Sequence, residues 1–431
     1  MYYFSTNRTS VDVSFRKAVI NGQPDDRGLY FPSEIPHIGA EWFARIGTIS
    51  AAQVAFDVIR PYVGGEIADE KLFEICRETL EMDIPLVPLT ERISSLELFH
   101  GPTLAFKDVG ARFMSRCLGA FAADEGQKTL VIVATSGDTG GAVAAGFYGI
   151  EGVEVVILYP KGKVSRVQEL QLTTFGGNVT TLELQGSFDD CQKIAKQILS
   201  DGEMRSKARL TSANSINVAR WLPQQFYYFL AVKQWHGSEP PVISVPSGNF
   251  GNLAAGVLAH ASGLPIKHFI AACNVNDVVP RFLIDGVYSP RTTIPTLSNA
   301  MDVGDPSNFV RISEIFGGDL ERIRAAITAY SVTDAEIVDT IRNVYLQSNY
   351  ILDPHGAVAY RSLANYLDGK LNEGGIFLET AHPVKFDAVA NTLGNGGATP
   401  ASVAELENKS RHSIEVPNDV DAVRDIILTR S

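Results

Sequence analysis

Short runs of apolar residues recur along the chain, and most of them lead through a turn into a helical pattern. The clearest runs cover residues 129–134, 153–160 and 241–246. Two further runs, at 268–273 and 374–380, have the same character. Continuously apolar strands that alternate with helices are typical of a parallel sheet covered on both faces. The pattern therefore predicts an α/β protein.

Capping signals show where several helices begin. Ser187 with Asp190, and Thr333 with Glu336, each form a capping pair before a stretch whose apolar residues share one helical face. Asp353 is followed by proline, an arrangement typical of the first residues of a helix. These signals place helices between the predicted strands.

The same patterns divide the chain into three regions. The chain before Pro85 has a mostly helical pattern, and the sequence WHGSEPP interrupts the alternation near residue 238. We therefore expect an N-terminal region over 1–95, a smaller α/β domain over 96–238 and a larger α/β domain over 239–431.

Composition narrows the class of protein. Of the 431 residues, 45% are apolar and 20% are charged, as in a globular enzyme. Lys and Arg number 37 against 49 Asp and Glu, which gives a net charge of -12. The chain has no basic run, so we expect no nucleic-acid partner. An anionic ligand would need positive potential that is built locally.

The four cysteines and the N-terminus both favour the cytoplasm. The cysteines are widely spaced and form no disulfide framework or zinc motif, which fits reduced thiols. The N-terminal residues lack the basic start and apolar stretch of a signal peptide. No apolar run approaches the roughly 20 residues of a membrane span. The eight histidines form no H-E-x-x-H motif, so we expect no metal site.

Two glycine-containing turns are candidates for anion binding. Residues 136–141 (SGDTGG) and 247–252 (SGNFGN) each follow an apolar run and open a helix. Free N–H groups at a helix N-terminus attract anions, and ligands of open α/β sheets bind at such turns. Neither turn matches a nucleotide-phosphate motif. The alternative is that the glycines only permit tight turns.

Lys107 is a candidate nucleophile. It follows apolar residues in HGPTLAFKD and begins a helical pattern. Apolar surroundings depress the pKa of a lysine, and the resulting neutral amine can form a Schiff base. The alternative is an ordinary lysine that extends to solvent at a helix start.

Two further segments carry polar groups in apolar surroundings. In 212–224, Asn217 and Arg220 are spaced so that they can share a helical face and hold a phosphate or carboxylate; a solvated face is the alternative. In 378–386, Thr380 ends a predicted strand and Lys385 follows. A hydroxyl at the end of a strand points toward the ligand crevice, although a buried threonine often only bonds backbone.

Taken together, these motifs resemble those of the threonine synthase family in order and spacing. The resemblance rests on FKD at Lys107, SGDTGG, NSIN-x-x-R, SGNFGN and ETAHPVKF, and it extends to residues 13–32 and 300–311. It implies a pyridoxal-phosphate enzyme of fold type II, related to the tryptophan synthase β subunit, with two open twisted sheets, flanking helices and a mostly helical N-terminal region. The length resembles the bacterial and fungal type.

The resemblance also implies roles for particular residues. Lys107 would be the Schiff-base lysine and proton shuttle. Thr380 would hydrogen-bond the pyridine nitrogen, and the cofactor phosphate would be cradled by Gly248, Asn249, Phe250, Gly251 and Asn252. The amino-acid end of the substrate would meet Ser136, Gly137, Asp138 and Thr139. Its phosphate would face Asn217, Arg220 and Lys385.

The activity that the resemblance implies is the conversion of O-phospho-L-homoserine and water to L-threonine and phosphate, the last step of threonine biosynthesis. Such an enzyme is a carbon–oxygen lyase acting on a phosphate. We expect a monomer or weak homodimer without a membrane partner. Two alternatives are a phospho-lyase that releases 2-oxobutyrate and a non-catalytic binding module on the same fold.

Overall fold

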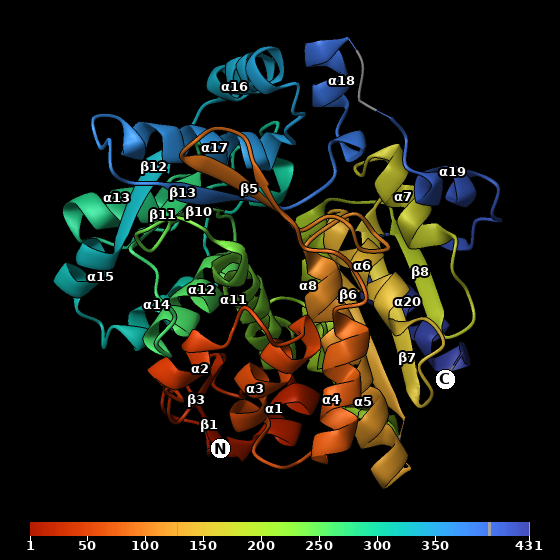
Figure 1. The fold of residues 1–431 in the computed structure, drawn as a ribbon. Helices are drawn as coiled ribbons and strands as arrows, with labels where there is room; N and C mark the ends of the chain where they lie inside the picture. Colours follow the sequence, from red (N-terminus) through yellow and green to blue (C-terminus); the bar gives the residue numbers. More distant parts are fainter. Residues whose placement is uncertain (127, 395–397, 431) are drawn as a thin grey trace.

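In the computed structural model, which describes residues 1–126, 128–394 and 398–430, the strands form three sheets (Figure 1). The largest sheet contains, in spatial order, β12 (Ile327–Ser331), β11 (His268–Cys273), β10 (Val242–Pro246), β13 (Gly375–Glu379), β5 (Ile93–Glu97) and β4 (Leu86–Pro88). Its strands are parallel except for the pairing of β4 with β5.

The second sheet is entirely parallel. Its strands, in spatial order, are β14 (Ser413–Val416), β8 (Val179–Leu184), β7 (Val153–Pro160), β6 (Thr129–Ala134) and β9 (Arg209–Ser212). A small antiparallel sheet at the N-terminus consists of β2 (Val13–Ser14), β1 (Tyr2–Ser5) and β3 (Tyr30–Pro32). The apolar runs at 129–134, 153–160 and 268–273 are thus confirmed as buried strands.

Helices surround the sheets (Figure 1). The N-terminal region has α1 (Phe15–Asn21), α2 (Ala40–Ala44), α3 (Ala51–Val63) and α4 (Asp69–Thr79). The next group is α5 (Lys107–Glu125), α6 (Asp138–Phe147), α7 (Arg166–Thr173), α8 (Phe188–Leu199), α9 (Gly202–Lys207), α10 (Val218–Trp221), η1 (Leu222–Gln224) and α11 (Gln225–Gln234).

The remaining helices begin with α12, which follows β10. They are α12 (Gly251–Ala261), α13 (Val278–Asp285), η2 (Asn299–Met301), α14 (Phe309–Ile315), α15 (Leu320–Ala326), α16 (Asp334–Ser348), α17 (Pro354–Leu367), η3 (Pro383–Lys385), α18 (Asp387–Leu393), α19 (Ala401–Glu407) and α20 (Val420–Arg430).

The β6 sequence explains why the five-stranded sheet is covered on both faces. Leu130 and Ile132 point to one face, where they join a core cluster with residues of α8 and α20. Val131 and Val133 point to the other face and join the core that includes α5 and α6. Because successive side chains of a strand alternate between faces, an unbroken apolar run requires two apolar covers.

The sheets do not follow the predicted regions throughout. β5 begins before residue 96 yet lies in the larger sheet, whereas β14, near the C-terminus, pairs with β8 of the smaller sheet. The predicted segment 239–431 therefore contributes to both sheets, and the predicted N-terminal region also holds strands. These pairings join residues far apart in sequence, so local patterns could not reveal them.

Candidate active site

Lys107 is the first residue of α5, and the backbone before it is paired with the chain that follows β13. The N–H of Phe106 donates to the carbonyl of Thr380 at 2.9 Å, and the N–H of His382 donates to the carbonyl of Leu104 at 3.0 Å. The sequence signals at Lys107 and Thr380 are thus two sides of one backbone arrangement. The fold brings the predicted nucleophile and the predicted ring contact together.

The amine of Lys107 lies among charged side chains inside the protein. Its Nζ is 4.0 Å from Oδ2 of Asp138. Burial lowers the pKa of Lys107, and the nearby charges of Lys385 and Arg220 lower it further, while Asp138 and Asp353 act in the opposite direction. The net shift is downward, which favours the neutral amine that proton transfer and covalent chemistry require.

Asp138, the first residue of α6, is the centre of the charged cluster. Its Oδ1 accepts hydrogen bonds from Nζ of Lys385 at 2.6 Å and from Nε2 of Gln168 at 3.0 Å. Burial alone would raise the pKa of Asp138, but Lys385 and Lys107 together hold it below its usual range. Nζ of Lys385 also donates to the carbonyl of Thr103 at 2.8 Å. Asp138 and Lys385, predicted to bind opposite ends of a substrate, therefore contact each other.

The turn before α6 is mostly buried and reaches solvent at Ser136. Ser136 is exposed and Thr139 is half-buried, while Gly137 has a φ of 144°, which favours glycine. The hydroxyl oxygen of Thr135 accepts from the N–H groups of Gly137 and Gly140 at 3.0 and 2.9 Å. The N-cap residue Gly137 has no side chain, so the Thr135 hydroxyl fixes the first turn of α6 in its place.

The turn before α12 has the form of an anion site. Phe250 is left-handed, with a φ of 62°, and no side chain caps the helix that begins at Gly251. A Cβ at Gly248 would lie 2.6 Å from Cα of Met301, so only glycine fits against that backbone. The side chain of Asn249 is bonded within the protein, which leaves backbone N–H groups as the donors of this turn.

Two adjacent tyrosines of α11, which sequence reasoning missed, connect this turn with the lysine segment. The hydroxyl of Tyr227 donates to the carbonyl of Phe106, and that of Tyr228 donates to the carbonyl and Oδ1 of Asn252, at 2.9 and 2.8 Å. Nδ2 of Asn252 is buried without a hydrogen-bond partner. A buried tyrosine needs a partner for its hydroxyl, so the pair of tyrosines in an apolar helix was the available signal.

Asn217 and Arg220 occupy different environments. Nδ2 of Asn217 donates to the carbonyls of Val19 and Ser212, and its Oδ1 accepts the N–H of Ala219. Asn217 therefore caps α10, and all its polar atoms have protein partners. Arg220 is buried and donates from Nη1 to the carbonyl of Ala213, but its Nε has no partner. Burial lowers the pKa of Arg220 to about 10, so it remains a cation at neutral pH.

A group of buried acids lies behind Thr380, and sequence reasoning assigned it no role in the site. Oε1 of Glu379 accepts the N–H of Asp353, and Nδ1 of His355 lies 2.5 Å from Oδ1 of Asp353. Burial and the proximity of Asp353 raise the pKa of Glu379 well above its usual value. In the described part of the chain, the Thr380 hydroxyl makes no hydrogen bond, so it can serve a ligand.

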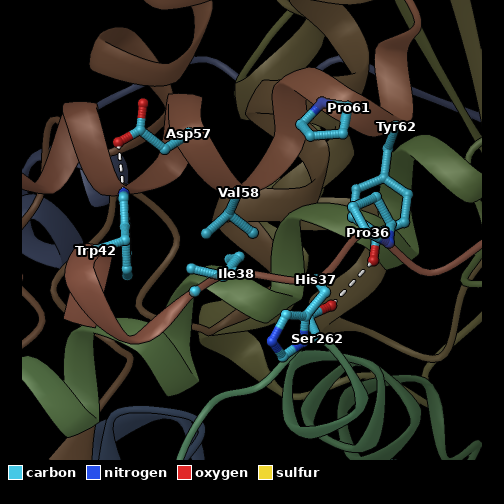
Figure 2. Close-up of a pocket in the computed structure, with 10 residues that line it drawn as sticks. Pro36, His37, Ile38, Trp42, Asp57, Val58, Pro61, Tyr62 and Ser262 are labelled. Atoms are coloured by element: carbon cyan, nitrogen blue, oxygen red, sulfur yellow. Dashed lines mark hydrogen bonds between the residues drawn. The ribbon is translucent and has the colours of Figure 1, made fainter.

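A separate cavity of about 260 Å³ lies between the N-terminal region and the end of α12 (Figure 2). Nε1 of Trp42 donates to Asp57 at 2.7 Å, and the hydroxyls of Tyr62 and Ser262 lie 3.3 Å apart. The other lining residues include Ile38 and several further apolar side chains. None of the predicted site residues lines this cavity, which is therefore not the candidate active site.

Comparisons with known proteins show the family of this chain. Residues 92–380 match the family model for pyridoxal-phosphate-dependent enzymes. Residues 2–80 match the model for the threonine synthase N terminus, and 356–427 match that for the threonine synthase C-terminal region. The threonine synthase of Escherichia coli is 42% identical over 419 residues, 96% of each chain. That of Haemophilus influenzae is 42% identical over 99% of this chain and 100% of its own.

Solved structures show the same relationship. The crystal structure of threonine synthase from Escherichia coli has a TM-score of 0.92 and 41% identity, with both chains fully covered. The structure of PLP-bound threonine synthase from Brucella melitensis has a TM-score of 0.95 and 35% identity, and it covers 100% of this chain and 99% of its own. The chain belongs to the threonine synthase family of pyridoxal-phosphate-dependent enzymes.

Proposed function

We propose that this protein converts O-phospho-L-homoserine and water to L-threonine and phosphate. The observation that carries the proposal is one half-buried amine, Lys107, with a lowered pKa, placed among Asp138, Lys385 and Arg220 and joined through α11 to an uncapped helix N-terminus. A protein with a net charge of -12 thus has two local sites for phosphate groups.

The residues fit pyridoxal phosphate. The turn from Gly248 to Asn252 offers backbone N–H groups and the unpartnered Nδ2 of Asn252 for the phosphate, and the Thr380 hydroxyl would bond the ring nitrogen. Lys107 supplies the amine that would hold the cofactor. When bound, the cofactor supplies an electron sink for negative charge that develops on the substrate carbons.

Lys107 also moves protons in the proposed reaction. Its Nζ takes a proton from Cα of the substrate and, once that proton has been passed on, one from Cβ. Phosphate leaves with the electron pair of the Cγ–O bond, and Nζ returns a proton to Cγ. Water then adds its hydroxyl to Cβ, so that of the three protons released, from Cα, Cβ and water, one goes to Cγ, one returns to Cα and one leaves with the phosphate. A flexible amine whose pKa lies below that of an ordinary lysine suits successive transfers in both directions. Asp138 attracts the protonated form of this amine, since its Oδ2 lies 4.0 Å from Nζ.

We assign the substrate phosphate to Arg220 and Lys385. Arg220 has a buried Nε without a partner, and phosphate is an acceptor that suits a guanidinium. Lys385 would exchange part of its contact with Asp138 for the substrate. The turn from Ser136 to Thr139 would receive the amino-acid end. Asn217 is left out, because its polar atoms already have partners.

The setting of the reaction follows from the same features. We propose that the enzyme works in the cytoplasm on a small-molecule substrate, because its four cysteines are free and buried. Among the described residues, no helix combines the length and the apolar character that a membrane crossing needs. A monomeric or weakly dimeric state stays a prediction.

The test is a complete product analysis. Protein loaded with pyridoxal phosphate is incubated with O-phospho-L-homoserine, and threonine, phosphate and 2-oxobutyrate are measured together. We expect threonine and phosphate in equal amounts. Mainly 2-oxobutyrate would replace the proposal with a phospho-lyase, and no turnover by a protein that has bound the cofactor would favour a binding module. Lys107→Ala serves as the inactive control.

A further inference from the structure

The segment from Ser307 to Phe309 lies directly against the turn at 247–252. The backbone N–H and the hydroxyl of Ser307 both donate to Oδ1 of Asn249, at 2.8 and 2.7 Å. The N–H of Asn308 donates to the backbone carbonyl of Asn249 at 3.2 Å. The rings of Phe309 and Phe250 meet edge to face, with centroids 5.8 Å apart. Three consecutive residues therefore contact Asn249 and Phe250.

These contacts stabilise a left-handed backbone conformation at Phe250 that is unfavourable without them. Phe250 has a φ of 62°, which costs free energy for any residue with a Cβ. Such a conformation persists only where surrounding contacts determine it. Here the contacts act on Asn249 and on the Phe250 ring, and the N–H groups at the start of α12 follow immediately.

Asn308 and Arg311 extend the contact to the segment before α10. Oγ of Ser215 accepts from Nδ2 of Asn249 and from Nδ2 of Asn308, both at 3.1 Å. Nη1 of Arg311 donates to Oδ1 of Asn308 at 2.6 Å and to the carbonyl of Ser215 at 3.2 Å. Its Nη2 donates to the carbonyl of Ile216 at 2.7 Å. The turn, Asn308 and residues 215–216 form one network.

Arg311 is an unusual member of this network because it is fully buried among neutral groups. Its relative exposure is 0%, and its guanidinium lies 4.2 Å from the Trp221 ring centroid. Burial lowers the pKa of Arg311 to about 9. A planar guanidinium can bond several carbonyls from fixed directions, which a lysine cannot do. Its Nη2 also donates to the carbonyl of Tyr30 at 3.2 Å, so the guanidinium bonds Asn308, residues 215–216 and the N-terminal region at once. These hydrogen bonds offset the cost of burying the charge.

We propose that Ser307, Asn308, Phe309 and Arg311 form a clamp that holds the turn at 247–252 in its phosphate-binding conformation and fixes it to residues 215–216. Asn308 and Arg311 are positioning residues in this arrangement. The inference rests on the proposed role of the turn as the cofactor-phosphate site. It assigns a function to the 300–311 motif, which the proposed reaction does not use.

The experiment measures the affinity for two ligands and the rate of hydrogen exchange in full-length variants. Apoprotein is titrated with pyridoxal phosphate and with pyridoxal, which lacks the phosphate, and hydrogen exchange is followed in peptides that cover 247–252. Asn308→Ala removes the contacts to Ser215 and Arg311. Arg311→Lys keeps the positive charge but removes the planar guanidinium that bonds several carbonyls. Asn178→Ala is the matched control, because the Asn178 amide, like that of Asn308, both donates and accepts hydrogen bonds: its Nδ2 donates to the carbonyls of Phe147 and Val153, and its Oδ1 accepts the N–H of Gly149.

Asn308→Ala should weaken pyridoxal phosphate binding about tenfold and pyridoxal binding less than about twofold, because a buried hydrogen-bond network is lost only at the phosphate turn. Exchange at 247–252 should become faster in both clamp variants, and Asn178→Ala should change neither property. If the folded clamp variants bind pyridoxal phosphate as tightly as the parent and exchange at 247–252 is unchanged, the proposed clamp is wrong. If the unaltered protein binds both ligands equally, the proposed phosphate role of the turn is wrong, and the exchange result alone decides whether the clamp exists.

Discussion

Two regions of this molecule are suited to a phosphate group, and they are built by opposite means. Around Lys107, charged side chains from separate segments are buried together, and Asp138 pairs with Lys385 at 2.6 Å. At 247–252, the donors are backbone N–H groups and an amide, and the hydrogen bonds that the Asn249 side chain makes are with neutral groups. One region depends on charge, the other on backbone conformation.

The difference suits the ligands proposed for the two regions. A resident cofactor gains from donors that are permanently oriented and need no counterion. A substrate that must enter and leave gains from charges whose present partner, Asp138, can be exchanged. We therefore expect changes of charge to affect the first region and changes of backbone freedom to affect the second.

The largest expected effect comes from Lys107→Ala. This variant removes the amine proposed to transfer every proton, so turnover should fall at least about a thousandfold. Threonine formation by the cofactor-loaded variant measures the loss, and circular dichroism controls for folding. A folded variant that retains more than about a tenth of the parent turnover would remove Lys107 from its role.

Lys385→Met should have the next largest effect. Loss of a charged donor should lower kcat/KM for O-phospho-L-homoserine about 10- to 100-fold. Lys385→Arg, which restores a cation, is the matched control and should recover part of the loss. Equal kinetics of Lys385→Met and the parent would show that the substrate phosphate binds elsewhere.

The same Lys385→Met variant should also be more sensitive to acid. Without Lys385, less opposes the effect of burial, so the pKa of Asp138 should rise toward its usual value. A carboxylate with a lowered pKa stabilises the protein above its unfolded pKa, and this contribution is lost as pH falls through the folded pKa. The variant should therefore unfold at a higher pH than the parent during acid titration, and coincident titrations would contradict this pairing.

Gly248→Ala tests whether the turn at 247–252 depends on its backbone conformation. The new Cβ would lie 2.6 Å from Cα of Met301 and 2.9 Å from the carbonyl oxygen of Ala300, so backbone must move. We expect affinity for pyridoxal phosphate to fall about tenfold. Gly251→Ala is the control, since the nearest atom to its Cβ, Nδ2 of Asn308, lies 3.5 Å away. Similar affinities for both variants would argue against a conformation-dependent site.

The smallest effect should come from Thr380→Val, which keeps the branched shape and removes the hydroxyl. Loss of one neutral hydrogen bond to the cofactor ring should lower kcat about two- to tenfold. Thr380→Ser retains the hydroxyl and should stay closer to the parent. A reversed order of the two variants would mean that shape, and not hydrogen bonding, matters at this position.

Sequence patterns predicted features that depend on neighbouring residues. The capping pairs at Ser187 and Thr333 are confirmed as capping boxes, and Asp353 caps α17. Lys107 begins a helix, as its pattern indicated. These features follow from side chains that bond backbone a few residues away, which a linear sequence displays directly.

Features that depend on distant contacts could not be read in the same way. The pairing of β14 with β8 joins residues 413–416 to residues 181–184. Arg311 bonds the carbonyl of Ile216, 95 residues away, and Tyr227 bonds that of Phe106, 121 residues away. The spacing of Asn217 indicates a possible phosphate contact, and the family resemblance implies a substrate role, yet its bonds to Val19 and Ser212 use its donors. The spacing placed it near the site but could not show which partners it had.

Two lysines have different roles in the proposed site: the half-buried Lys107 is the reactive amine, and the buried Lys385 is the partner of Asp138. Borohydride reduction of the cofactor-loaded protein, followed by peptide mass spectrometry, tests this directly. We predict the cofactor mass on the peptide that contains Lys107 and none on the peptide that contains Lys385. A cofactor adduct on Lys385, or one that persists in Lys107→Ala, would contradict the account.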